Sequence, residues 1–189
     1  MADWLGPQRA GAACDRILEA AGELFAERGV ESVGMNDIAK AAGCSRATLY
    51  RYFESREALH TAYVHRHAQA VNAELAGLVV DIAEPGERLL AALTHALRLV
   101  RENPALAAWF ALSPIGAEAA AASEVVQALT AGFLLSVGPG DVAAAQRRAR
   151  WLVRVLTSFL AVPGCDPEEE RAMLAEFVVP AMCSPAIGG

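Results

Sequence analysis

Residues 34 to 59, GMNDIAKAAGCSRATLYRYFESREAL, constrain the fold of this chain more than any other segment. Ile38, Ala39 and Ala42 fall on one side of a first short helix. Gly43 can supply a tight turn, because a residue without Cβ takes positive φ without strain. Ser45 is then placed to cap the next helix through its hydroxyl. The segment therefore predicts two short helices joined by a glycine turn, with a third helix starting straight after them.

The second of these helices, residues 46 to 53, divides its side chains between two faces. At ~100° per residue, Leu49 and Phe53 fall together as an apolar i, i+4 pair that must face a core. Tyr50 and Tyr52 flank that pair. The opposite side carries small or hydrogen-bonding side chains, namely Ala47, Thr48 and Arg51. This is the layout of a helix-turn-helix that places its second helix in the major groove of DNA.

The chemistry of the exposed side fits the same role. Small residues let a helix approach base edges, and phenol hydroxyls on each flank can reach phosphates. Arg46, in the first turn, can reach a guanine edge or a phosphate. Two alternatives stay open: the helix could present an ordinary solvated face, and Tyr52, which lies closer to the apolar pair, could be partly core.

Residues 15 to 63 resemble the N-terminal DNA-binding domain of the TetR family of bacterial regulators. The matching motifs are RILEAAGELFAERG, DIAKAAGCS and ATLYRYFESREAL. The resemblance implies that the second helix reads an operator and that Arg56, opening the next helix, binds phosphate. Three positions depart from the family: Gly34 replaces a capping Thr or Ser, Cys44 stands where Val is common, and Asn36 stands where some members use arginine. The candidate DNA-binding residues are Asn36, Ser45, Arg46, Ala47, Thr48, Tyr50, Arg51, Tyr52 and Arg56.

The charge distribution is consistent with a DNA-binding head, although the net charge is −6. From Lys40 to Arg66 there are five basic and two acidic residues, 5 − 2 = +3, whereas from His67 onward eight arginines face thirteen acids, 8 − 13 = −5. Charge near the phosphates matters more than the total, because screening weakens interactions beyond ~8–10 Å. A window of this length can also reach +3 by chance.

The rest of the chain predicts helices throughout, so the expected fold class is all-α. An apolar stripe precedes Gly29, and a helix over residues 55–80 connects the head to the remainder. Later helices are delimited by Pro85-Gly86, Asn103-Pro104, the GPGD run at 138–141 and Asp166-Pro167. About nine helices result, including one long helix over 117–136. We expect a helix-turn-helix domain over residues 10–54 and a helical effector-binding and dimerisation domain over 55–183.

Two helices near the C-terminus are candidates for a dimer interface, because each carries a wide apolar stripe. A symmetric pair of heads would read two half-sites spaced by whole turns of DNA. The alternative is that both stripes pack within their own domain. The candidate interface residues are Trp151, Leu152, Val155, Leu156, Phe159, Met173, Leu174 and Phe177.

The family resemblance also implies that the C-terminal domain binds a small molecule and then releases DNA. The candidate pocket residues are His95, Trp109, Phe110 and Phe133, each of which could instead belong to the core. An apolar effector is expected, because no charged cluster is visible. The fourth predicted helix would carry the coupling between the two sites.

Other function classes find no support in the sequence. No motif combines a nucleophile, a base and an orienting residue, and no cofactor-binding glycine loop or metal-ligand cluster is visible, so neither an enzyme nor a cofactor or metal site is expected. No leader or membrane-spanning run is visible, which predicts a cytoplasmic protein without a membrane partner. The prediction is a ligand-responsive regulator, a repressor that binds a palindromic DNA operator as a homodimer. The alternative is a DNA-binding protein without an effector.

Overall fold

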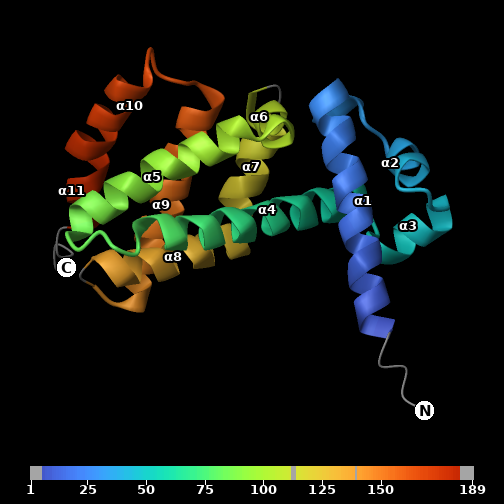
Figure 1. The fold of residues 1–189 in the computed structure, drawn as a ribbon, viewed down its shortest axis with the longest axis horizontal. Coiled ribbons are helices and arrows are strands. Elements are labelled where there is room, and N and C mark those ends of the chain that lie inside the picture. Colours follow the sequence, from blue (N-terminus) through green and yellow to red (C-terminus); the bar gives the residue numbers. More distant parts are fainter. Residues whose placement is uncertain (1–5, 112–113, 139, 184–189) are drawn as a thin grey trace.

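The computed structural model describes residues 6–111, 114–138 and 140–183, and this part of the chain is built of helices without a strand (Figure 1), which confirms the all-α expectation. The elements are α1 (Gly6–Arg28), a 3₁₀ turn (Val30–Ser32), α2 (Met35–Ala41), α3 (Arg46–Tyr52), α4 (Arg56–Val79), α5 (Pro85–Glu102), α6 (Pro104–Ala111), α7 (Pro114–Ala122), α8 (Glu124–Val137), α9 (Val142–Ala161), α10 (Pro167–Met173), a π-helical segment (Leu174–Val178) and α11 (Val179–Cys183).

The head helices begin and end where local chemistry requires. Gly43 turns the chain after α2 with φ of +66°. The Ser45 hydroxyl accepts a hydrogen bond from the Thr48 amide at 3.0 Å and so caps α3. At the start of α2, Gly34 has no hydroxyl, and the Asp37 carboxylate instead accepts from the Gly34 amide at 3.0 Å. The start of α2 therefore keeps only the half of a capping box that the N3 side chain provides.

The head core is continuous with the rest of the molecule. Leu49 and Ile38 are fully buried against Phe25 of α1. The same cluster continues along α4 through Tyr63 and ends on α6, where Trp109 is 1% exposed. Figure 1 shows α4 running from the head, where α1 crosses it, into the body. The head and the body thus share one apolar seam.

The body surrounds the far half of α4. Helices α5 and α8 pack against α4, and α8 packs along α9. The chain from α10 to α11 packs against α5 at the end of the molecule opposite to α2 and α3 (Figure 1). A second core cluster lies here, with Leu89, Leu152 and Leu174 at its centre.

Two predicted helices are interrupted. The expected helix over 117–136 is divided between α7 and α8 at Ser123, whose hydroxyl accepts from the Val126 amide at 3.2 Å and starts α8 as its cap. The last helix contains the π-helical segment, which inserts an extra residue per turn and rotates the faces of α11 relative to α10. The break at Ser123 carries no proline or glycine signal in the sequence, whereas Pro180, two residues after the π-helical segment, has no backbone N–H to donate inside the last helix.

An ion pair closes the distal end of the body. Arg101 of α5 binds both carboxylate oxygens of Glu170, at 2.6 and 2.8 Å, and also donates to the Phe159 carbonyl at 2.9 Å. Glu170 is 4% exposed and accepts in addition from the Gly164 amide at 2.7 Å. Hydrogen bonding from Arg101 lowers the pKa of Glu170, so the carboxylate is charged and α5, α9 and α10 are held together.

Within the described ranges, no single helix has both the length and the hydropathy needed to cross a membrane; α8 and α9 reach them only together, with a bend of 119° between them.

Candidate nucleic-acid interface and ligand cavity

The outer face of α3 is solvent-accessible. Arg46, Ala47 and Arg51 are exposed, and Tyr50 is 36% exposed. Leu49, on the opposite side, is fully buried. The division of faces predicted from the sequence is therefore present in the fold, while contact with DNA by these residues stays a prediction.

The side chains of this face are ordered by their neighbours. The Arg46 guanidinium lies 5.3 Å from the centre of the Tyr50 ring, and Arg51 lies 5.4 Å from that of Tyr52. The Thr48 hydroxyl lies 2.9 Å from the Ser45 hydroxyl. Tyr52 is half-buried and packs against the head core, in agreement with the alternative that it is partly core. The cationic and phenolic groups are thus held beside each other on one surface.

Arg56 and Asn36 lie beside α3 in different environments. One guanidinium nitrogen of Arg56, Nη2, donates to the carbonyls of Val30 at 2.6 Å and Glu31 at 3.1 Å. Arg56 therefore holds the turn that follows α1, a role that its sequence position did not indicate. Asn36 is exposed in the first turn of α2. Contact of either residue with phosphate or base remains a prediction.

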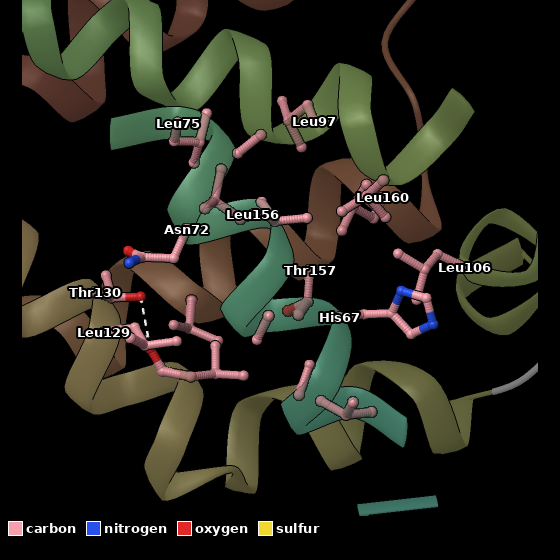
Figure 2. A pocket seen from close by; sticks show the side chains of 18 of the residues that line it. His67, Asn72, Leu75, Leu97, Leu106, Leu129, Thr130, Leu156, Thr157 and Leu160 are labelled. Carbon is pink, nitrogen blue, oxygen red and sulfur yellow. Dashed lines mark hydrogen bonds between the residues drawn. The ribbon is translucent and has the colours of Figure 1, made fainter. Parts of the chain in front are cut away.

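A cavity of about 190 Å³ lies in the body and is lined by α4, α5, α6, α8 and α9, with one residue from α7 (Figure 2). Its walls are mostly aliphatic. Three of the four predicted pocket residues, Trp109, Phe110 and Phe133, are part of the lining.

The expectation for His95 does not agree with the structure. The residues of α5 that line the cavity are Ala92, Leu93, Ala96, Leu97 and Val100. At ~100° per residue, His95 lies roughly 130° around the helix from the centre of that face. Its Nδ1 instead lies 3.4 Å from Nη2 of Arg98.

Sequence reasoning missed the largest contribution to the wall, which comes from α4. Six residues at i, i+3, i+4, i+7, i+8 and i+11 line the cavity, and two of them are polar: Val64, His67, Ala68, Val71, Asn72 and Leu75. That spacing is the signature of one helix face and was visible in the sequence. Thr130 of α8 and Thr157 of α9 are the other polar contributions to the lining.

The residues predicted to form a dimer interface separate into two groups. Leu152 and Leu156 line the cavity, and Leu174 is fully buried in the core of its own domain. Val155 and Phe159 are half-buried against the same core. By contrast, Trp151 is 44% exposed, Met173 36% and Phe177 64%. The alternative that the stripes pack within their own domain therefore holds for the first group, and the second group remains available for an interface.

An aromatic cluster connects the cavity wall to the head. Trp109 stacks on Tyr63 with ring centres 5.3 Å apart, and Phe25 of α1 packs edge-on against both rings at 5.4 Å. His60 lies 4.9 Å from Trp109 and 5.6 Å from Phe25. A displacement of the Trp109 ring from its cavity side would directly displace side chains of α1 and α4, because close-packed rings transmit displacement.

The cluster makes stability depend on pH through His60. Burial lowers the pKa of His60 from 6.5 to about 4. Between these values the unfolded chain binds more protons than the folded chain, so stability falls as the pH drops from 6.5 towards 4. We expect a loss of about 2 kcal/mol between pH 7 and pH 5, measured by urea unfolding. Burial shifts the pKa of His67 in the same direction.

His60→Leu removes the titrating group and should flatten this pH profile. His65→Leu is the matched control, because His65 lies on the same helix but is half-exposed. A His60→Leu protein with the pH slope of the wild type would contradict the assignment. The lowered pKa of Glu170 also stabilises the fold, and this stabilisation is lost as the pH falls below the ordinary pKa of 4.5. Measurements above pH 5 therefore report mainly on His60.

Comparison with known proteins identifies the type of head. A family model described as "Bacterial regulatory proteins, tetR family" matches residues 17–63. The uncharacterized HTH-type transcriptional regulator Rv1255c of Mycobacterium tuberculosis is 59% identical over 180 residues, which is 94% of this chain and 89% of that protein. The HTH-type transcriptional repressor KstR of the same organism is 33% identical over 112 residues, 59% of this chain and 51% of that protein.

Solved structures resemble the whole chain. FadR of Thermus thermophilus, in complex with lauroyl-CoA, superposes with a TM-score of 0.61 at 27% identity and covers 93% of this chain and 100% of that one. RolR in complex with resorcinol superposes with a TM-score of 0.70 at 21% identity over 95% and 91% of the two chains, a likeness of fold alone.

Proposed function

The chain belongs to the TetR family of bacterial transcriptional regulators, and on that basis we propose that it is a repressor released from its operator by a small apolar effector. Residues 10–54 act as the DNA-binding domain and residues 55–183 as the effector-binding and dimerisation domain. The observation that carries the proposal is the position of Trp109, which lines the cavity and also belongs to the head core.

The outer face of α3 supports operator binding. Arg46, Arg51 and the phenol of Tyr50 are exposed together, while Leu49 is buried on the opposite side of the helix. Arg46 and Arg51 bring positive charge to the surface that would meet phosphates. In this proposal α3 is the recognition helix of each chain, and two chains would be needed to read a palindrome.

The exposed apolar residues of α9, α10 and the π-helical segment support a homodimer. Trp151, Met173 and Phe177 are large side chains whose exposure costs stability in a monomer. We propose that a two-fold axis brings this face onto a second copy. Leu152, Leu156 and Leu174 serve the core and the cavity instead.

The cavity supports a small-molecule effector, and FadR of Thermus thermophilus, which is 27% identical, was crystallised with lauroyl-CoA. An effector in the cavity would touch α6 through Trp109 and α4 through its whole inner face. Ligand binding changes the position of the DNA-binding heads only if the ligand binds one arrangement of the heads more tightly than another.

The test is binding to a DNA fragment from the gene's own neighbourhood, measured by fluorescence anisotropy. Arg46→Ala and Tyr50→Phe should each weaken binding, the former about tenfold or more, with melting temperatures near the wild type because both residues are exposed. Arg98→Ala is the matched control, since Arg98 is an exposed arginine of α5. Wild-type affinity for both α3 variants would exclude α3 as the reading helix.

The second candidate function is DNA binding without an effector. It is favoured if no molecule that raises the melting temperature also weakens DNA binding. The aromatic cluster between cavity and head favours the ligand-responsive alternative.

A further inference from the structure

The polar groups of the cavity are few, uncharged and unequal in what they offer a ligand. Among the described residues that line it, none is Asp, Glu, Lys or Arg. The polar side chains are His67, Asn72, Thr130 and Thr157, together with the buried indole N–H of Trp109. Burying a carboxylate or an ammonium group in such walls would leave a charge without a partner, which is strongly unfavourable.

Both threonine hydroxyls already use their protons. Thr130 donates to the Val126 carbonyl at 2.8 Å and Thr157 to the Arg154 carbonyl at 2.9 Å. Their oxygens can still accept a hydrogen bond but have no proton left to donate. The donors that line the cavity are therefore the Asn72 amide, the His67 ring and the indole N–H of Trp109, and the last of these is buried within the aromatic cluster.

The Asn72 amide has its N–H donors and its carbonyl acceptor free. Within the described part of the chain its amide makes no hydrogen bond, although the residue is half-buried. Its neighbours on the same face of α4 are Ala68, Val71 and Leu75, so an aliphatic side chain would suit the wall better. An amide with two donors and one acceptor at this place fits a neutral oxygen group of a ligand.

His67 offers a second neutral contact further along the cavity. It lies five residues before Asn72, which corresponds to about 7.5 Å along α4. In Figure 2 the His67 ring lies at the right and the Asn72 amide at the left, with Leu156 and Thr157 between them. Burial and the nearby Arg66 lower the pKa of His67, so its ring is neutral near pH 7 and provides one donor and one acceptor.

We propose that the effector is an uncharged, elongated apolar molecule with a hydroxyl or carbonyl group, held by the Asn72 amide, and with room for a second neutral polar group at His67. This rests on the proposed function, because it describes the ligand of the same cavity. An amphiphile with a charged polar group would bind only through its apolar tail. Its charged group would stay in solvent and would make no hydrogen bond with Asn72.

The test compares four probes of equal chain length: 1-octanol, 2-octanone, octanoate and octylamine. Isothermal titration calorimetry on the full chain at pH 7 measures their affinities. We expect both neutral probes to bind at least about tenfold more tightly than both ions, since even partial burial of an unpaired charge costs more than one hydrogen bond provides.

Substitution at Asn72 separates an anchoring role from general packing. Asn72→Leu should weaken 1-octanol and 2-octanone about fivefold, the equivalent of one neutral hydrogen bond, without weakening octanoate. Asn72→Asp should bind octylamine more tightly than the wild type does, which a merely misfolded variant would not do. Glu74→Gln is the control, because Glu74 is an exposed polar residue of the same helix.

Octanoate binding as tightly as 1-octanol, an Asn72→Leu protein with wild-type affinity for the neutral probes, or no binding of any neutral probe would each overturn the proposal. Operator release is measured separately by anisotropy. If a charged compound binds and releases DNA while the neutral probes do not, the repressor function stands and the assignment of a neutral ligand falls.

Discussion

Replacing Trp109 with alanine should lower the free energy of unfolding by about 3–5 kcal/mol, the range for removing a fully buried aromatic side chain. Trp109 is 1% exposed and stacks on Tyr63 while packing edge-on against Phe25 and His60. Three different helices, α1, α4 and α6, lose contact at once. The neighbouring rings are themselves tightly held, so the vacated space cannot collapse easily.

Urea unfolding of the full chain measures this loss, and Trp151→Ala is the matched control. Trp151 is 44% exposed, so its removal should cost far less in the isolated chain. A comparable loss in both variants would show that burial in the aromatic cluster is not what makes Trp109 important. Because Trp109 also lines the cavity, any protein that remains folded should bind the neutral probes with altered affinity.

Leu49→Ala should destabilise the head by about 2–5 kcal/mol and reduce operator binding, although Leu49 faces away from DNA. Its side chain is fully buried in the head core, where α3 packs against α2. Without this anchor the exposed face of α3 is no longer presented at a defined angle. The loss of DNA affinity would then follow from loss of structure.

Hydrogen exchange of the α2 and α3 amides, combined with DNA-binding anisotropy, distinguishes this effect from loss of a DNA contact. Leu49→Ala should speed exchange in the head, whereas Arg46→Ala should leave exchange unchanged and weaken binding alone. Leu78→Ala is the control, because Leu78 is 44% exposed on α4. A Leu49→Ala protein with wild-type exchange and wild-type operator affinity would contradict the role of Leu49 as the anchor of α3.

The head could be predicted closely because its structure depends on local rules. A glycine turn, a serine cap and an i, i+4 apolar pair each involve residues only a few positions apart. Each can therefore be recognised in the sequence. The opposite faces of Leu49 and Arg51 followed from helix geometry alone. Arg56 was different: its hydrogen bonds to the Val30 and Glu31 carbonyls join parts of the chain 26 and 25 residues apart, and no local rule indicates them.

The body was predictable as helices but not as an arrangement of helices. Periodicity identified apolar stripes on α5 and α9, yet it could not say which partner each stripe would meet. Leu152 and Trp151 are adjacent in sequence, and one lines the cavity while the other is exposed. The break at Ser123 also lacked a strong sequence signal, because a serine within an alanine-rich run is compatible with an unbroken helix.

The sequence by itself thus determined the all-helical class and the two faces of α3, since both arise from contacts between near neighbours in the chain. Only the tertiary structure decided where the cavity lies, that α4 forms its polar wall through His67 and Asn72, and that His95 is turned away from it. Those outcomes depend on the angles and distances at which helices from distant parts of the chain pack, and side-chain periodicity carries no information about them.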